Sequence, residues 1–161
     1  MSTRAIVFQK LPTTVAEIKP CNDPELVAAY AMAALAMYPL NPNESVAMLN
    51  LLRGPRPLSG FDQQFLKDCF RGKEYLIRSY FQGATPANNY APSEPYTLVV
   101  ETNPYTYTSP GYANFKLYSG GADSPRDLKL RQKPSTGEWF LWEYGGILSG
   151  IRIPVAADPW A

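Results

Sequence analysis

The chain has 161 residues, a size that suits one domain with one hydrophobic core. Fifteen basic residues against fourteen acidic ones leave a formal charge of +1, so the overall balance favours neither nucleic acid nor an acidic membrane surface as a partner. Histidine is absent, which removes the side chain most often used for proton transfer near neutral pH and the commonest imidazole metal ligand.

The N-terminus and the longest apolar stretch bear on localisation. The first residues carry one Arg and a short apolar patch that Gln9 and Lys10 interrupt, unlike the continuous apolar run of a secretory signal. The uncharged apolar stretch that ends at Tyr38 is shorter than the roughly 18 to 20 residues that a membrane span needs. We therefore expect a cytoplasmic protein that does not engage a membrane.

Three helices are predicted in the first half of the chain. Residues 23–25, Asp-Pro-Glu, form a typical helix start, and the helix should run to about Tyr38 and be buried nearly all round. Residues 41–44 repeat this start chemistry, and Gly54 supplies the stop of a second helix. Residues 59–62 resemble a capping box. They open a third helix, ending at Gly72, with an apolar stripe made of Phe61, Phe65, Leu66, Cys69 and Phe70.

From Glu74 onward, β-branched and aromatic residues in short runs indicate strands. We place strands near residues 75–82, 96–102, 112–119, 127–133 and 138–144. The last two are the best marked, since apolar and basic residues alternate over 128–131 and a plausible hairpin loop follows at 134–137.

This order of elements predicts a single α+β domain over residues 1–161, with a layer of about three helices packed on an antiparallel sheet of about five strands. Its parts are an N-terminal arm (1–22), a helical part (23–72), a sheet part (73–144) and a C-terminal tail (145–161).

The long loops at 83–95 and 103–111 are rich in Pro, Tyr and Asn, and loops of this length are commonly functional or mobile. If the five strands form a simple meander, alternate connections fall at the same end of the sheet. Loop 83–95, loop 120–126 and the segment after the last strand then lie together, with loop 103–111 at the opposite end.

Catalytic and metal-binding patterns are weak. The chain has no GxSxG elbow, P-loop or GxGxxG fingerprint, and without histidine no Ser-His-Asp set is possible. Cys21 and Cys69 fit no zinc spacing, and we expect free, buried thiols, with a disulfide as the alternative. Asp123 with Asp127 is a weak cation signal, because a calcium loop supplies several more ligands, and we expect Asp123-Ser124 to form a local turn instead. We therefore expect no cofactor, no metal and no nucleic-acid partner.

Several longer motifs carry a resemblance to a known family. They are residues 11–17 (LPTTVAE), 48–59 (MLNLLRGPRPLS), 83–90 (GATPANNY), 119–126 (SGGADSPR), 139–143 (WFLWE) and 158–160 (DPW). In this order they resemble an uncharacterised bacterial domain family of unknown function, found largely in gut Firmicutes. The resemblance implies a bacterial, cytoplasmic setting. The chain departs from the pattern at Asp127, where a proline is more usual, and at Gly145-Gly146, where bulkier residues are.

The leading functional hypothesis is a non-enzymatic binding or interaction domain whose partner is another protein or a small ligand. Tyr, Trp and Arg are the usual anchors of interfaces, and the candidate binding residues are Asn88, Asn89, Tyr90, Asp123, Ser124, Arg126, Arg152 and Trp160. The structural alternative is that Trp160 seals the core edge while Arg126 and Arg152 satisfy buried carbonyls.

A second functional class remains open. The late hairpin after a helical layer is similar to the end of cone-shaped NTF2-like domains, which often hold a small apolar ligand. Such a protein would carry a ligand, or act as an enzyme through Asp, Glu or Tyr side chains. A deep apolar cavity with convergent carboxylates would favour this class, and a filled core with an exposed aromatic patch would favour the interaction domain.

Overall fold

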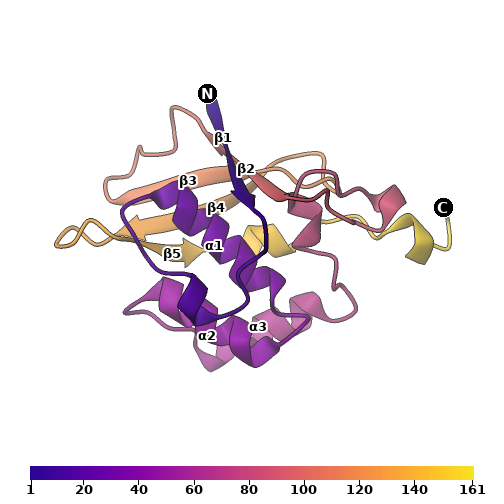
Figure 1. Cartoon of the computed structure of the whole chain (residues 1–161), viewed down its shortest axis with the longest axis horizontal. Coiled ribbons are helices and arrows are strands. Elements are labelled where there is room, and N and C mark those ends of the chain that lie inside the picture. The colour runs from indigo at the N-terminus through magenta and orange to yellow at the C-terminus, as the bar shows by residue number, and fades with distance from the viewer.

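The computed structural model describes all residues 1–161 and has the predicted α+β architecture (Figure 1). Three α-helices and a five-stranded antiparallel sheet account for its regular structure. The helices are α1 (Pro24–Ala36), α2 (Pro42–Arg53) and α3 (Gly60–Phe70), and the strands are β1 (Ser2–Phe8), β2 (Tyr96–Thr102), β3 (Tyr112–Leu117), β4 (Arg126–Gln132) and β5 (Trp139–Glu143).

The three helices begin where the local signals place them. The side chains of Asp23 and Asn41 accept hydrogen bonds from backbone amides in the first turns of α1 and α2. Ser59 and Asp62 form a reciprocal capping box at the start of α3. Each cap satisfies amides that have no partner within the helix, so these starts are determined by short-range chemistry.

The sheet is a meander in the order β1-β2-β3-β4-β5, but its first strand is not the predicted one. The prediction of a strand near residues 75–82 is wrong. That segment forms turns and a short 3-10 helix at Arg78–Tyr80, and Phe81 makes only an isolated bridge. Consecutive side chains from Tyr75 to Ile77 are all buried, which an alternating strand on a one-sided sheet does not allow.

The strand that completes the five-stranded sheet is β1, which comes from the N-terminal arm. Residues 2–8 pair with β2 along their whole length. Only Ile6 of this strand is buried, because β1 is at the sheet edge and its neighbouring side chains reach solvent. The apolar alternation by which strands are recognised is correspondingly faint here.

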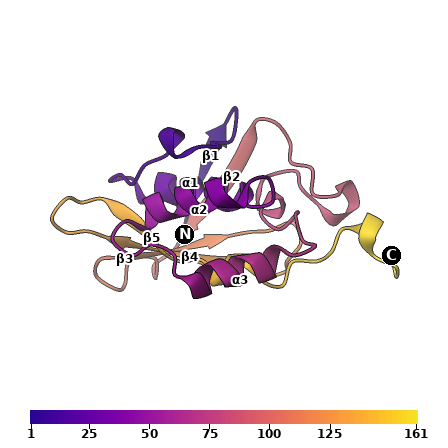
Figure 2. The same cartoon turned by 90° about the horizontal axis from the view of Figure 1, so that it is seen from below.

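One face of the sheet is covered and the other is open. Helix α1, which is buried nearly all round, crosses the covered face with α2 beside it, whereas α3 lies outside this layer (Figures 1 and 2). In β3 and β4 every second residue is buried, and the residues between them are half-buried or exposed. The polar residues of the open face therefore remain available to solvent. No helix has the length and apolarity needed to cross a membrane.

The end of α2 is set by a glycine that no other residue replaces without strain. Gly54 has φ of 61° and ψ of −119°, and a Cβ added there would lie 2.5 Å from ring atoms of Phe140. Gly72 has a similar φ of 67°, but an added Cβ would meet nothing.

We predict that Gly54→Ala lowers the free energy of unfolding by about 3 kcal/mol, because backbone strain and displacement of the Phe140 ring add together. Gly72→Ala, the matched control, should cost only about 1 kcal/mol. Urea unfolding with unchanged m-values measures both. Equal losses in the two variants would contradict the packing role assigned to Gly54.

Candidate functional site

The structure brings together at one sheet end the three segments that the meander predicts there. The hydroxyl of Tyr90, from loop 83–95, donates to the carbonyl of Arg152 in the tail at 2.5 Å. The amide of Arg152 donates to the carbonyl of Gly121, in the β3–β4 loop, at 2.9 Å. The amide of Gly120 donates to the carbonyl of Ser79 at 2.8 Å. We call this region the sheet-end cluster.

Within the cluster, the residues of loop 83–95 are engaged in holding the loop itself. The Asn88 carboxamide accepts from the amides of Thr85 and Ala91 and donates to the carbonyl of Gly83 at 2.7 Å. Asn89 adopts a left-handed conformation with φ of 57°, which Asn tolerates better than most residues. Tyr90 is fully buried, and burial raises the pKa of its hydroxyl, which therefore stays protonated.

Arg126 links the β3–β4 loop to the tail through side-chain hydrogen bonds. Its guanidinium donates to the carbonyls of Ser149 at 3.1 Å, Gly150 at 3.2 Å and Ser124 at 2.9 Å, and to the Ser124 hydroxyl. Arg152 pairs with Asp123 at 3.1 Å, but the Asp123 side chain is 93% exposed, so this ion pair contributes little stability. These arrangements agree with the structural alternative for Arg126.

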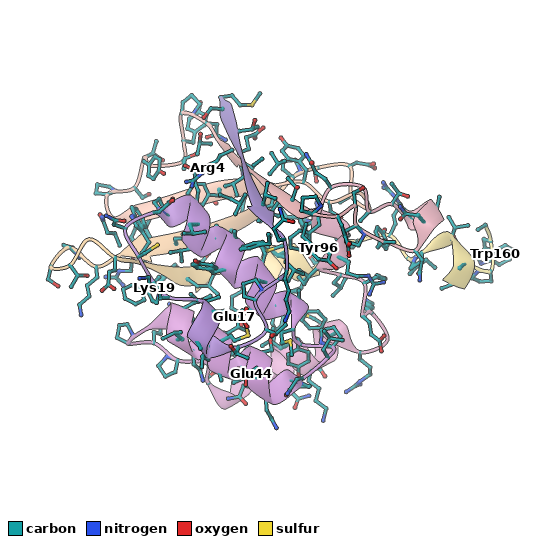
Figure 3. All side chains as sticks on the ribbon, in the orientation of Figure 1. Arg4, Glu17, Lys19, Glu44, Tyr96 and Trp160 are labelled. Atoms are coloured by element: carbon teal, nitrogen blue, oxygen red, sulfur yellow. The ribbon has the colours of Figure 1, made fainter.

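Trp160 does not join the cluster. Its side chain is among the most exposed of the chain, and the residue is tied only by a hydrogen bond from its amide to the carboxylate of Asp158 (Figure 3). Sealing of the core edge by Trp160 is therefore wrong. Its role in binding, like that of the other seven candidates, stays a prediction.

We predict that Arg126→Ala lowers the free energy of unfolding by about 2 kcal/mol, because it leaves loop and tail carbonyls without donors. Amide exchange at residues 149–152 should accelerate at the same time. Trp160→Ala, which removes no buried contact, should change neither quantity. If amide exchange in the tail of Arg126→Ala is as slow as in the wild-type protein, the role of Arg126 in holding the tail is contradicted.

Two hollows lie elsewhere, where α3 and the end of α2 meet the open face and β5. One hollow of about 540 Å³ is lined by residues of α3, β3, β4, the end of β5 and Gly145-Gly146. A neighbouring hollow of about 270 Å³, here called the basic groove, is lined by Arg53, Pro55, Arg56, Arg131, Gln132, Lys133, Pro134, Phe140 and Trp142. The two share Arg53, Arg56 and Trp142, so they are adjacent and have these side chains as a common wall.

Arg53 is the innermost cation of the basic groove. It is only 5% exposed, and its guanidinium donates through Nε to the carbonyl of Arg56 at 2.9 Å and through Nη1 to the carbonyl of Trp142 at 3.2 Å. Its Nη2 makes no hydrogen bond in the chain, and no carboxylate lies within ion-pair distance. Burial lowers the pKa of this guanidinium, which nevertheless stays charged.

Arg56 and Arg131 flank the ring of Trp142. Their guanidinium carbons lie 4.1 Å and 4.8 Å from the Trp142 ring centroid, and Arg131 also lies 5.6 Å from the ring of Tyr112. Cation–π contacts of this kind orient the guanidinium planes without using their N–H groups.

The side-chain N–H groups of these two arginines have no acceptor in the protein. Of the eight arginines in the chain, only Arg56 and Arg131 donate no side-chain hydrogen bond to any protein acceptor. Lys133 is also without a carboxylate partner. The basic groove thus combines four cations with no acidic residue in its lining.

The larger hollow contains three carboxylates, and each already has a partner. Asp62 accepts from the amide of Ser59 in the capping box, which lowers its pKa. Asp127 pairs with Lys116, and Glu143 lies 4.0 Å from Lys129. Burial raises the pKa of Tyr144, beside them, to about 12. All three carboxylates are thus engaged with other groups of the chain, whereas a general acid or base has to reach the proton that it transfers.

The groove was not predicted from the sequence, although its residues belong to conspicuous motifs. Arg53 and Arg56 come from the segment LLRGPRP, and Phe140 and Trp142 come from WFLWE. Phe61 and Phe65 belong to the predicted apolar stripe of the third helix but do not reach the core: Phe61 is 81% exposed, and Phe65 is also exposed. Helix α3 lies outside the helical layer, so only its other side, with Leu66 and Phe70, reaches the core.

Fold and site together define an α+β domain with a five-stranded meander, a helical layer on one face, and a basic, aromatic depression beside the open face. Residues 10–155 match the family model of the domain of unknown function DUF6935, and the chain belongs to this family. No curated protein and no solved structure matches it.

Proposed function

We propose that this domain is a non-enzymatic binding module and that it takes an anionic group of its ligand in the basic groove. The observation that carries the proposal is Arg53, a buried guanidinium without a carboxylate partner. Removing a charge from water costs free energy unless a partner compensates it. Two backbone carbonyls and the Tyr144 ring, whose centroid lies 5.8 Å from the guanidinium carbon, supply only part of that compensation. An anion in the groove would complete it.

The surrounding residues support the same ligand. Arg56, Arg131 and Lys133 add three cations with free N–H groups, and the guanidinium fork matches carboxylate and phosphate oxygens. Because Trp142 orients both arginines before a ligand arrives, little side-chain entropy is lost on binding. The net charge of the chain is only +1, so this concentration of positive charge is a local feature.

The NTF2-like alternative lacks comparable support. The space between the helical layer and the sheet is filled by a continuous cluster of 35 buried residues. The two hollows described above lie at the surface, and the carboxylates in the larger one are engaged in a helix cap and two ion pairs. A bacterial cytoplasmic setting is part of our proposal, and the free state of both cysteines agrees with a reducing compartment.

We predict that pyrophosphate and citrate bind at the basic groove of the intact chain. The indole N–H resonance of Trp142 should shift on titration, and the apparent Kd should rise with ionic strength because the attraction is electrostatic. The double variant Arg56→Gln/Arg131→Gln should weaken binding at least about tenfold, since it removes two charge-assisted donors.

The matched control is Lys10→Gln/Lys73→Gln, which removes the same charge from two exposed lysines outside the groove. It should leave the affinity within about twofold, as expected for screened, distant charges. If both double variants weaken anion binding equally, the effect depends only on the net charge of the protein, and a defined site is contradicted. An unchanged Trp142 resonance at saturating anion would overturn the proposal.

A further inference from the structure

The basic groove adjoins a larger hollow, and the size of the two together bears on the ligand. The groove of about 270 Å³ and the hollow of about 540 Å³ lie on either side of a wall that Arg53, Arg56 and Trp142 share. One carboxylate or phosphate group occupies only a small part of this space. A ligand anchored in the groove by its anionic group therefore has room to extend along α3.

The α3 wall of the larger hollow is apolar and exposed. Phe61 and Phe65 lie four residues apart, so they are neighbours on the same side of the helix. Phe61 is 81% exposed, and Phe65 approaches the backbone at Gly145, where an added Cβ would lie 3.8 Å from its ring. Exposed aromatic side chains beside a depression are typical of surfaces that contact a partner.

The remaining lining of the larger hollow carries both signs of charge. Asp62, Asp127 and Glu143 lie there together with Lys129 and Arg56. Three carboxylates disfavour a polyanion such as a nucleic-acid strand, which would have to pass them. A peptide, by contrast, can place one acidic side chain in the basic groove and continue with neutral or apolar residues.

A peptide also supplies hydrogen-bond donors. The carboxamide oxygen of Asn114, in the wall of the larger hollow, is buried and has no donor in the chain. A buried acceptor without a partner costs free energy, and a peptide N–H would satisfy it once the Asn114 side chain turns this oxygen towards the hollow.

On these grounds, and resting on the function proposed above, we infer that the ligand is an extended peptide segment of a partner protein. Its carboxylate side chains bind Arg53, Arg56 and Arg131 in the basic groove. A large apolar side chain, two or three residues along, packs between Phe61, Phe65 and the end of β5.

Fluorescence anisotropy with labelled hexapeptides tests this inference. The sequence Gly-Glu-Glu-Leu-Phe-Gly should bind at least about tenfold more tightly than Gly-Gln-Gln-Leu-Phe-Gly, which lacks the charge. It should likewise bind at least about tenfold more tightly than Gly-Glu-Glu-Gly-Gly-Gly, which lacks the apolar residues. Adenosine monophosphate, which joins an anion to an aromatic base, should compete no better than phosphate does.

Two protein variants distinguish the parts of the site. Phe61→Ser should weaken the complete peptide about tenfold and leave citrate binding unchanged, because the Phe61 ring lies outside the basic groove. Leu40→Ser, the matched control, removes an apolar side chain of similar exposure, 78%, that lines neither hollow. It should change neither affinity.

The outcomes separate this inference from the function on which it rests. In one outcome, Arg56→Gln/Arg131→Gln abolishes citrate binding, but all three peptides bind the wild-type protein with equal affinity. This outcome would overturn the inference of a peptide ligand and leave the proposed anion site standing. Tighter binding of adenosine monophosphate than of the complete peptide would overturn it in favour of a nucleotide. If the wild-type protein binds neither citrate nor the complete peptide, the inference and the proposed function are both overturned.

Discussion

The hydrogen bonds of one buried guanidinium organise the region on which our functional proposals depend. Arg53, the last residue of α2, joins this helix to the carbonyl of Trp142 in β5 and to the carbonyl of Arg56 in the following loop. The loop thereby folds back over the strand, and Arg56 is brought against the Trp142 ring. Gly54 permits this approach, since a side chain there would meet Phe140. The basic groove is thus a consequence of how α2 ends.

The two ends of the molecule differ in how completely their polar groups are used. In the sheet-end cluster, Asn88 and Arg126 spend their hydrogen-bonding capacity on backbone groups that would otherwise be unsatisfied. In the basic groove, Arg56 and Arg131 use none of theirs. Both regions are rich in Arg and aromatic residues, so composition does not distinguish them. The groups of the sheet-end cluster therefore hold the fold together, whereas the oriented arginines of the groove, which have no acceptor in the protein, are the basis of the anion site that we propose.

This difference also explains what the sequence could predict. Helix starts at Asp23, Asn41 and Ser59 depend on contacts within one turn, and they were read correctly. The convergence of loop 83–95 with the β3–β4 loop followed from strand parity, which survived the wrong assignment of the first strand. Strand β1 was missed because an edge strand with a single buried residue has little alternation.

The groove required information of another kind. Arg53 and Trp142 are 89 positions apart, and nothing local to either residue indicates that they meet. The sequence contains the arginines, but whether a guanidinium already has a partner depends on the whole tertiary structure. For the same reason, the exposure of Phe61 was not foreseen: the stripe of α3 is real, but only one side of the helix reaches the core.

Grouping four cations has a thermodynamic consequence for the domain itself. Unpaired like charges oppose the compact state, and Arg53 carries a desolvation cost besides. A ligand that supplies the counter-charge binds the folded chain and not the unfolded one, so it returns part of that free energy as stability. Acidic residues pair with Arg4, Arg71 and Arg152 elsewhere in the chain, whereas none pairs with a cation of the groove. Trp142 holds two of the four cations, Arg56 and Arg131, in place without neutralising them, and our proposal assigns that neutralisation to the ligand.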